Sequence, residues 1–388
     1  MILLAIIFWT GLFLIAYTYL IFPVLLRILS HGKKDECPPA NDDELPFLTV
    51  LIPAYNEEVV LERKLNSVLG ADYPKQRLEI LVGNDASTDR TAAILNQMCQ
   101  KHPLIRVRHF KARTGKPTMI NELVKDARGE LLVITDANVM IDPDALREMA
   151  FCFREPAVGL VDSQMINPDQ ASEKLMPQEQ IYNNREVRIK HREGLLWGTM
   201  MGPFGGCYAL RKSLYSPVPD NFLVDDFFIN MRVLEEGYRS ISRLPARVYE
   251  EIRHNEQQEF LRKKRISAGN FQNLVRFRRL LLSKRSGLAF CFFSHKVVRW
   301  CVPFLMLLTF LSSAILALHS SLYALLAFLQ LCLFLLPLID HFTRKIKCQV
   351  LPLRLVSHFV LMNLALLAGY FKYLGGINNN VWQPTKRQ

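Results

Sequence analysis

The eight cysteines of this 388-residue sequence form no C-x-x-C pair. Three of them, Cys291, Cys301 and Cys332, lie in strongly apolar surroundings. A zinc site and a secreted disulfide framework are therefore disfavoured. We expect reduced thiols that are buried or face lipid.

Glycine-rich phosphate loops are missing as well. Neither G-x-G-x-x-G nor G-x-x-x-x-G-K-[ST] follows any predicted strand. Dinucleotide binding and P-loop phosphate chemistry are therefore disfavoured. Half of the residues are hydrophobic, which excludes a disordered chain.

Acidic residues are in deficit, with 36 Asp+Glu against 48 Lys+Arg and a formal net charge of +12. Residues 253–299 alone contain 12 Lys/Arg and two Asp/Glu. Such an excess suits a nucleic acid, a membrane surface or an anionic substrate. Few aromatics stand where bases would stack, and no helix-turn-helix or RNA-motif signature is present, so a nucleic-acid partner is disfavoured.

Charged residues are absent from residues 2–26, a run long enough to cross a bilayer. A cleaved signal peptide would have Lys/Arg before this run and a small-x-small site after it, and neither is present. We expect a retained transmembrane helix. Arg27, Lys33 and Lys34 follow the run, which predicts that the next segment is cytosolic.

The C-terminal third contains three more candidate spans, at residues 301–318, 322–339 and 353–373. The basic loop 344–347 is expected in the cytosol. A complete third span would leave the tail outside, although it carries Lys386 and Arg387. Either the last segment is re-entrant or interfacial, or the tail is an exception to the charge rule.

Between these regions, short apolar runs alternate with amphipathic helical patterns. This alternation predicts a parallel sheet with crossover helices, an α/β layer in which ligands bind at the carboxyl ends of the strands. The predicted strands are 48–52, 79–82, 106–109, 131–135 and 159–163, and the predicted helices are 59–69, 91–101, 117–127 and 145–153.

Polar residues follow several of these strands. A carboxylate there accepts hydrogen bonds from a base or ribose, or holds Mg²⁺ or Mn²⁺ on a pyrophosphate. Asp89 is explained as the cap of the helix that starts at Thr91. Asp85 and Asp136 have no helix directly after them, so we expect a functional role for both.

The segments LTVLIPAYNEE, ILVGNDASTDRT, RTGKPTMINE and LLVITDAN resemble, in order and spacing, the motifs of family-2 inverting glycosyltransferases of the GT-A fold. The resemblance covers roughly residues 48–270 and implies a nucleotide-sugar donor, most often UDP-linked. The family's Asp-x-Asp is here Asp136-Ala137-Asn138, so Asn138 is the weaker of two metal ligands or a neighbour of the metal. By similarity, the donor site comprises Ala54, Tyr55, Glu57, Asp85, Lys116 and Asp136.

Two later motifs continue the resemblance. Gly205 and Gly206 lie in a segment that borders the acceptor site in the family, although a simple tight turn would explain them equally well. Asp225 and Asp226 resemble the family's acidic pair, whose second carboxylate takes the proton of the acceptor hydroxyl. By this resemblance we expect Asp226 to be the base. Adjacent carboxylates raise each other's pKa, which helps a base to act near neutral pH.

Arg262 and Arg265 match the Gln/Arg-x-x-Arg-Trp motif that processive relatives place near the diphosphate. Ile266 replaces the Trp, which puts processive polymerisation in doubt. A solvated basic helix face is the other explanation for these arginines. The basic, apolar segment 271–300 is expected to lie at the membrane interface and to bind anionic headgroups.

These inferences combine into one expected organisation. It comprises a transmembrane helix (1–27), a linker (28–46), a cytosolic GT-A domain (47–270), interfacial helices (271–300), about three transmembrane helices (301–374) and a tail (375–388). The tail motif VWQPTKR also resembles that of bacterial members similar to poly-N-acetylglucosamine synthases. The expected enzyme is a multi-pass protein of the cell membrane that uses Mg²⁺ or Mn²⁺ and contacts membrane lipids.

Its expected reaction moves a hexose or N-acetylhexosamine from a UDP-sugar to a polysaccharide or lipid-linked acceptor. One alternative is a single-sugar transferase that acts on a polyprenyl phosphate or glycolipid. A binding protein of the same fold without catalysis is another. The presence of Asp85, Asp136 and Asp226 disfavours that second alternative.

Overall fold

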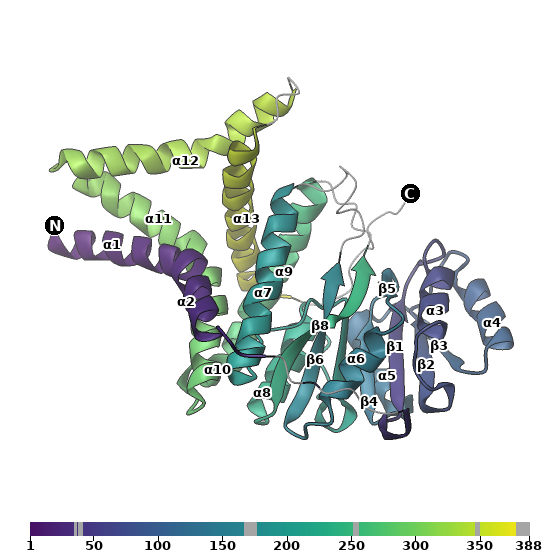
Figure 1. The fold of residues 1–388 in the computed structure, drawn as a ribbon. Coiled ribbons are helices and arrows are strands. Elements are labelled where there is room, and N and C mark those ends of the chain that lie inside the picture. The colour runs from purple at the N-terminus through teal and green to yellow at the C-terminus, as the bar shows by residue number, and fades with distance from the viewer. Residues whose placement is uncertain (35–36, 38–41, 167–176, 251–255, 346–349, 378–388) are drawn as a thin grey trace. The chain divides into compact units, whose positions relative to one another are not determined.

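A computed structural model describes the chain except for residues 35–36, 38–41, 167–176, 251–255, 346–349 and 378–388 (Figure 1). The chain divides into two compact units. The sheet unit comprises Ser30–Lys174 and Val187–Arg253. The helical unit comprises Met1–Leu29, Leu175–Glu186 and His254–Gly376.

One eight-stranded sheet forms the centre of the sheet unit, in the order β3-β2-β1-β4-β7-β6-β8-β5. Strands β1 to β4 run parallel, whereas β7 is antiparallel to both β4 and β6. Strand β8 pairs parallel with β6 and antiparallel with β5. The strands are β1 (Leu48–Ala54), β2 (Leu78–Asn84), β3 (Ile105–His109), β4 (Leu131–Thr135), β5 (Val139–Ile141), β6 (Val158–Ile166), β7 (Cys207–Arg211) and β8 (Arg239–Glu250).

Helices cover both faces of this sheet. Every residue of β1 is buried, so the strand is apolar on both sides, as expected for a parallel sheet between helical layers. On one face, alternate residues of β1 and β2 form a core with α3 (Leu61–Leu69), α4 (Thr91–Lys101) and α6 (Ala145–Cys152). On the other face lie α5 (Lys116–Asp126) and α8 (Asp225–Glu235).

The five strands and four helices predicted from the alternation are all present, with ends shifted by a few residues. Strands β5, β7 and β8 were not predicted. They supply the antiparallel pairs of the sheet, and β7 brings residues from far along the chain next to β4.

The helical unit contains four helices that are long and apolar enough to cross a membrane, counted over the residues that the structure describes (Figure 1). These candidate spans are Ile2–Leu29, Ser286–Leu316, Ser321–Thr343 and Leu351–Leu374. The second begins at Ser286, before the predicted start at residue 301. The helices of the helical unit are α1 (Ile2–Ala16), α2 (Phe22–Leu29), α9 (Glu256–Phe277), α10 (Ser286–Cys291), α11 (Val298–Leu316), α12 (Ser321–Lys345) and α13 (Leu351–Leu374). Two π-helical turns, Tyr17–Ile21 and Phe292–Val297, also belong to it.

Small residues let these helices approach one another closely. A Cβ atom added at Gly11 in α1 would lie 2.6 Å from Thr309 Cγ2 in α11. At Gly369 in α13, an added Cβ would overlap Ser267 in α9, and the Ser267 hydroxyl donates to the Leu366 carbonyl at 2.7 Å. Close approach through small residues and interhelical hydrogen bonds is typical of helices in lipid.

His295 and Arg299, at the end of segment 271–300, are buried, which corrects the expectation of headgroup contacts for these two residues. Arg276, Arg278, Arg279 and Lys284 are exposed, so the expectation stays a prediction for them. α7 (Pro177–Trp197) belongs to the helical unit up to Glu186. Glu186 accepts from His295 Nε2 at 2.7 Å, Lys296 Nζ at 3.1 Å and Arg299 Nη1 at 2.7 Å. Burial alone would raise the pKa of Glu186, but these three cations together lower it well below its usual value.

Parts of the predicted organisation fall outside the described residues. These are the tail from residue 378, much of the linker, and the side chains of loop 344–347. Segment 271–300 divides between the end of α9, a short 3-10 turn (Arg278–Leu282) and the start of the second candidate span.

Candidate functional site

The loops that follow β1 and β2 are joined by hydrogen bonds at the carboxyl edge of the sheet. Asn56 has a left-handed backbone, with φ of 53°, and its side-chain oxygen accepts from the Thr88 amide at 2.8 Å. The Glu57 amide donates to Thr91 Oγ1 at 2.9 Å. Ala54 is buried at the end of β1, and its carbonyl accepts from the Asp85 amide. The two motifs therefore form one surface, as the strand order requires.

Tyr55 has a partner that the sequence did not indicate. The guanidinium of Arg113 lies over the Tyr55 ring, 3.5 Å from its centroid. This stacking orients a flat aromatic face and a cation at the strand edge. A nucleotide base and a diphosphate are the kinds of ligand that such a pair can contact.

Asp85 is buried and holds the loop that precedes α5. Its Oδ1 accepts from the amide and hydroxyl of Thr114 at 2.7 and 2.8 Å, and its Oδ2 accepts from the Gly115 amide at 2.9 Å. Gly115 has φ of 87°, a conformation that favours glycine. The loop delivers the next residue, Lys116, into the site. The sequence does not indicate these contacts, because Thr114 and Gly115 lie 29 and 30 residues further along the chain.

Lys116 joins two predicted groups. Its Nζ lies 2.7 Å from Asp136 Oδ1 and 3.9 Å from Asp225 Oδ2. Burial would lower the pKa of Lys116, but Asp136, Asp225 and Asp226 together outweigh it and raise the pKa. The lysine therefore stays charged near the carboxylates. Asp225 Oδ2 is buried and has no hydrogen-bond partner among the described residues.

Asp226 lies beside Asp225 in the first turn of α8. Burial and the neighbouring Asp225 raise the pKa of Asp226 to about 6. Its Oδ1 accepts from the Phe227 amide at 2.8 Å. Its Oδ2 lies against Gly205, where an added Cβ atom would come within 2.5 Å of that oxygen. Gly205 also has φ of 82°, so the site requires glycine there.

A divalent cation fits the donor set at Asp136. This carboxylate is about one-third exposed, and only one of its oxygens bonds Lys116. Asn138 donates its amide to Glu250 Oε1 at 2.9 Å, which adds a carboxylate that the sequence did not indicate. The described residues form no cluster of three or more His, Cys, Asp or Glu around a metal position. One or two carboxylates together with substrate phosphates are the usual way in which proteins hold Mg²⁺.

A buried ion pair supports the glycine segment, which consists of Gly205 and Gly206. Lys190 Nζ lies 2.8 Å from Asp162 Oδ2, and both side chains are almost fully buried. The lysine also lies over the Phe204 ring at 3.6 Å, and the Phe204 amide donates to Asp162 Oδ1. Neither Lys190 nor Asp162 stands in a recognisable sequence motif. They fix the residue that precedes Gly205.

The structure therefore brings most of the predicted residues to one edge of the sheet unit. Arg262 and Arg265 belong to α9 of the helical unit. Arg262 pairs there with the buried Glu259, at 2.8 Å. Their role toward the donor stays a prediction.

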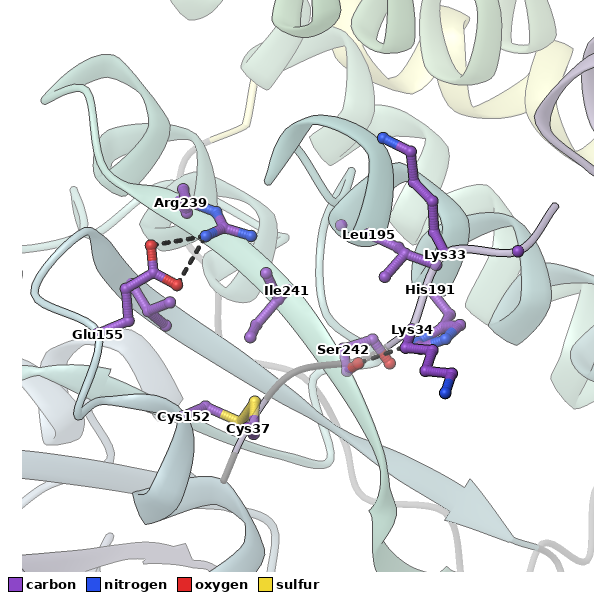
Figure 2. Close-up of a pocket in the computed structure, with 13 residues that line it drawn as sticks. Lys33, Lys34, Cys37, Cys152, Glu155, His191, Leu195, Arg239, Ile241 and Ser242 are labelled. Carbon is purple, nitrogen blue, oxygen red and sulfur yellow. Dashed lines mark hydrogen bonds and ion pairs between the residues drawn. A yellow bond between two sulfur atoms is a disulfide. The ribbon is translucent and has the colours of Figure 1, made fainter. Parts of the chain in front are cut away.

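A cavity of about 510 Å³ lies elsewhere in the sheet unit, beside the linker (Figure 2). Its lining residues include Lys33, Lys34, Arg239 and Glu155, and Arg239 Nη1 donates to both carboxylate oxygens of Glu155. A disulfide between Cys37 and Cys152 also lines it, so the expectation that all cysteines are reduced is wrong. The pairing was not predicted because the two residues are 115 positions apart.

Residues 49–217 match the protein family described as Glycosyl transferase family 2. A probable glycosyltransferase of Bacillus subtilis, YdaM, is 41% identical over 25% of this chain and 24% of its own length. The beta-monoglucosyldiacylglycerol synthase of Synechocystis is 32% identical over 34% of this chain and 29% of its own. The poly-beta-1,6-N-acetyl-D-glucosamine synthase of Staphylococcus aureus is 33% identical over 32% of this chain and 30% of its own. The matches thus span less than a third of these curated relatives.

A solved structure resembles nearly the whole chain. The mannosyltransferase PcManGT of Pyrobaculum calidifontis, in complex with GDP-Man and Mn²⁺, superposes with a TM-score of 0.72 at 21% identity. The match covers 95% of this chain and 99% of that one. Together with the four apolar helices, this likeness confirms the expected fold class, a GT-A α/β domain with candidate transmembrane helices.

Proposed function

From the premise that residues 49–217 form a glycosyltransferase family 2 domain, we propose that the chain is a membrane-integral inverting glycosyltransferase. It transfers a hexose or N-acetylhexosamine from a nucleoside-diphosphate sugar, in first place a UDP-sugar, to a polysaccharide or lipid-linked acceptor. The observation that supports this most is the convergence of Lys116, Asp136, Asp225 and Asp226 at the strand edge.

The reaction is a single in-line displacement. Asp226 takes the proton of the acceptor hydroxyl as its oxygen bonds to the anomeric carbon, and the bond from that carbon to the phosphate oxygen breaks. A pKa of about 6 leaves this carboxylate ionised at neutral pH but basic enough to accept the proton. Inversion follows because attack and departure take place on opposite faces of the sugar.

Lys116 stabilises the charge that develops on the departing nucleoside diphosphate. Its pKa is raised by the surrounding carboxylates, so it remains an ammonium throughout the working range. A bound Mg²⁺ or Mn²⁺, held by Asp136 with Asn138 beside it, would supply further positive charge to the same phosphates. Glu250 orients the Asn138 amide for that role.

The four apolar helices support membrane association. We propose a multi-pass protein whose sheet unit faces the cytosol, because Arg27, Lys33 and Lys34 follow the first span. A cytosolic domain would have access to nucleotide sugars. Protease protection of sealed vesicles, with and without detergent, tests this orientation.

The decisive experiment incubates the purified full chain in lipid nanodiscs with a panel of labelled UDP- and GDP-sugars. We expect one donor to be consumed in a Mn²⁺- or Mg²⁺-dependent way, with release of the nucleoside diphosphate. Consumption of none, with lipid and oligosaccharide acceptors present, would contradict the proposal.

The Asp226→Asn variant should lose transfer by at least about 100-fold, because general-base catalysis contributes roughly that much or more. Binding of UDP with Mn²⁺ should stay within about twofold of the wild type, since the base acts on the acceptor. Glu236→Gln, at the exposed end of the same helix, is the matched control and should retain activity. Full activity of Asp226→Asn would refute the assignment.

Transfer of a single sugar to a lipid acceptor is the second candidate. It is favoured by Ile266, which replaces the Trp of the processive motif, and by the similarity to diacylglycerol glucosyltransferases. Sizing the product separates the two candidates: one added sugar indicates a lipid acceptor, and a ladder indicates polymerisation.

A further inference from the structure

Lys64 is a fully buried lysine whose hydrogen bonds go to neutral oxygens. It lies in α3, on the sheet face opposite α5. Its Nζ donates to Thr135 Oγ1 at 2.8 Å and to the Val139 carbonyl oxygen. These acceptors are the last residue of β4 and the first residue of β5, so Lys64 connects two successive strands.

Packing alone gives no reason for a charge at this position. Burying an ammonium group is costly unless it is well compensated. Burial lowers the pKa of Lys64 to about 8, an effect that Cys207 and Asp136 partly offset. A methionine has a similar length and would fill the same volume without this cost, so we look for what the ammonium group does.

Its two acceptors delimit the turn that carries the predicted metal and diphosphate residues. Asp136 and Asn138 lie between Thr135 and Val139 in sequence. Thr135 Oγ1 in turn donates to the Gly206 carbonyl at 3.0 Å, and the Asp136 amide donates to the same oxygen at 2.9 Å. Gly206 follows Gly205, which contacts Asp226. One network therefore links α3, the Asp136 turn and the glycine segment beside the base.

We propose that Lys64 is a positioning residue, which fixes the Thr135–Val139 turn so that Asp136 and Asn138 present their oxygens to the donor diphosphate and its cation. This proposal rests on the proposed function. Lys64 itself does not contact substrate in this arrangement, because it lies beneath the turn. Its effect passes through the backbone and hydroxyl oxygens that it holds.

The test replaces Lys64 by Met in the full chain and measures binding of UDP, and of GDP, in the presence of Mn²⁺ by calorimetry. The dissociation constant should rise by about 10-fold, the effect usually seen when a residue that orients metal ligands is lost. The Tm should stay within about 4 °C of the wild type, because removing a buried charge compensates for the lost hydrogen bonds. Arg63→Met, the exposed neighbour on the same helix, is the matched control and should bind like the wild type.

A second pair of variants keeps the proposal testable if Lys64→Met does not fold. Thr135→Val removes the hydroxyl between Lys64 and Gly206, whereas Thr135→Ser keeps it. We expect weaker binding in the first and recovery in the second. A purely structural role predicts a lower Tm and a smaller binding-competent fraction with an unchanged dissociation constant, and that result would overturn the proposal.

The two proposals fail in different ways. If the wild type binds neither nucleotide with Mn²⁺ and transfers no sugar, the proposed function is wrong. If the wild type binds and Lys64→Met or Thr135→Val binds equally well, only the positioning role is wrong.

Discussion

Asp225 and Asp226 are adjacent in sequence but have different surroundings. Asp226 receives a hydrogen bond from the Phe227 amide and contacts Gly205, whereas Asp225 faces Lys116 at 3.9 Å. Burial is the main cause of the raised pKa of Asp226, and the charge of Asp225 adds to it. The pair thus separates into one carboxylate beside a cation and one suited to accepting a proton.

This difference predicts a pH profile. Activity should fall on the acid side with an apparent pKa of about 6, since only the ionised form of Asp226 accepts the proton. Asp225→Asn removes the like charge, so the pKa of Asp226 should decrease and the acid limb should move to lower pH. The measurement is kcat/KM against pH for both proteins at constant ionic strength.

Glu236→Gln again serves as the control and should leave the acid limb in place. An unchanged limb in Asp225→Asn would mean that burial alone sets the pKa. A shift to higher pH would contradict the assignment of the base.

The residues that the sequence predicted share one property: they follow strands or begin a helix within a recognisable motif. Their partners do not. Glu250 and Lys190 enter the site through contacts between segments that are far apart, and nothing local distinguishes them from solvated charges. Arg113 begins the RTGKPTMINE motif, but its contact with Tyr55 is also one between distant segments. Lys64 is the clearest example, because a lysine on an amphipathic helix is normally expected to face water.

At the scale of elements, strands β1, β2, β3, β4 and β6 follow from the sequence, whereas β5, β7 and β8 do not. Strands β1, β2 and β4 are buried on both faces and so appear as continuous apolar runs. β5 has only three residues and pairs with β8 more than 100 positions later. β8 contains Pro245 and several arginines, which obscure the strand pattern.

The contact between α9 and α13 gives a prediction about a single element pair. Gly369→Val would place a branched side chain where Ser267 and the Lys264 carbonyl already lie. We expect a loss of about 1–3 kcal/mol in stability from overpacking, seen as a lower Tm of the detergent-solubilised protein.

The control for this contact is Gly375→Val. Gly375 ends the same helix, and an added Cβ there meets its nearest atoms at 3.6 Å, an ordinary contact. Equal Tm values for the two variants would show that the close approach of α9 and α13 contributes little.

For the whole molecule, the positive charge of residues 253–299 is distributed differently from the sequence-based expectation. Arg262 pairs with Glu259, and His295, Lys296 and Arg299 surround Glu186. The amino-acid composition shows the excess of Lys and Arg in this segment. It does not predict the ion pairs with Glu186, because Glu186 is about 110 residues away from its partners. Arg276, Arg278, Arg279 and Lys284 are exposed, so for these four residues the contact with headgroups stays a prediction.

The four candidate spans, counted over the residues that the structure describes, predict resistance to salt. The full chain should remain in the membrane pellet after washes with 1 M salt, where the Debye length is about 3 Å, and with alkaline carbonate, and only detergent should release it. Immunoblotting of pellet and supernatant is the measurement, with a peripheral membrane protein as the control. Release by salt alone would contradict membrane integration through these helices.

The contact between Gly205 and Asp226 also supplies a chemical tool. A methyl group at residue 205 would occupy space next to the oxygen that accepts the proton, while the charges at Lys116 and Asp136 stay as they are. Gly205→Ala should therefore displace the Asp226 carboxylate and stop transfer. Asp226→Asn leaves Gly205 in place and should instead hold donor and acceptor together without reacting, which is the state needed to visualise an intact ternary complex by cryo-electron microscopy.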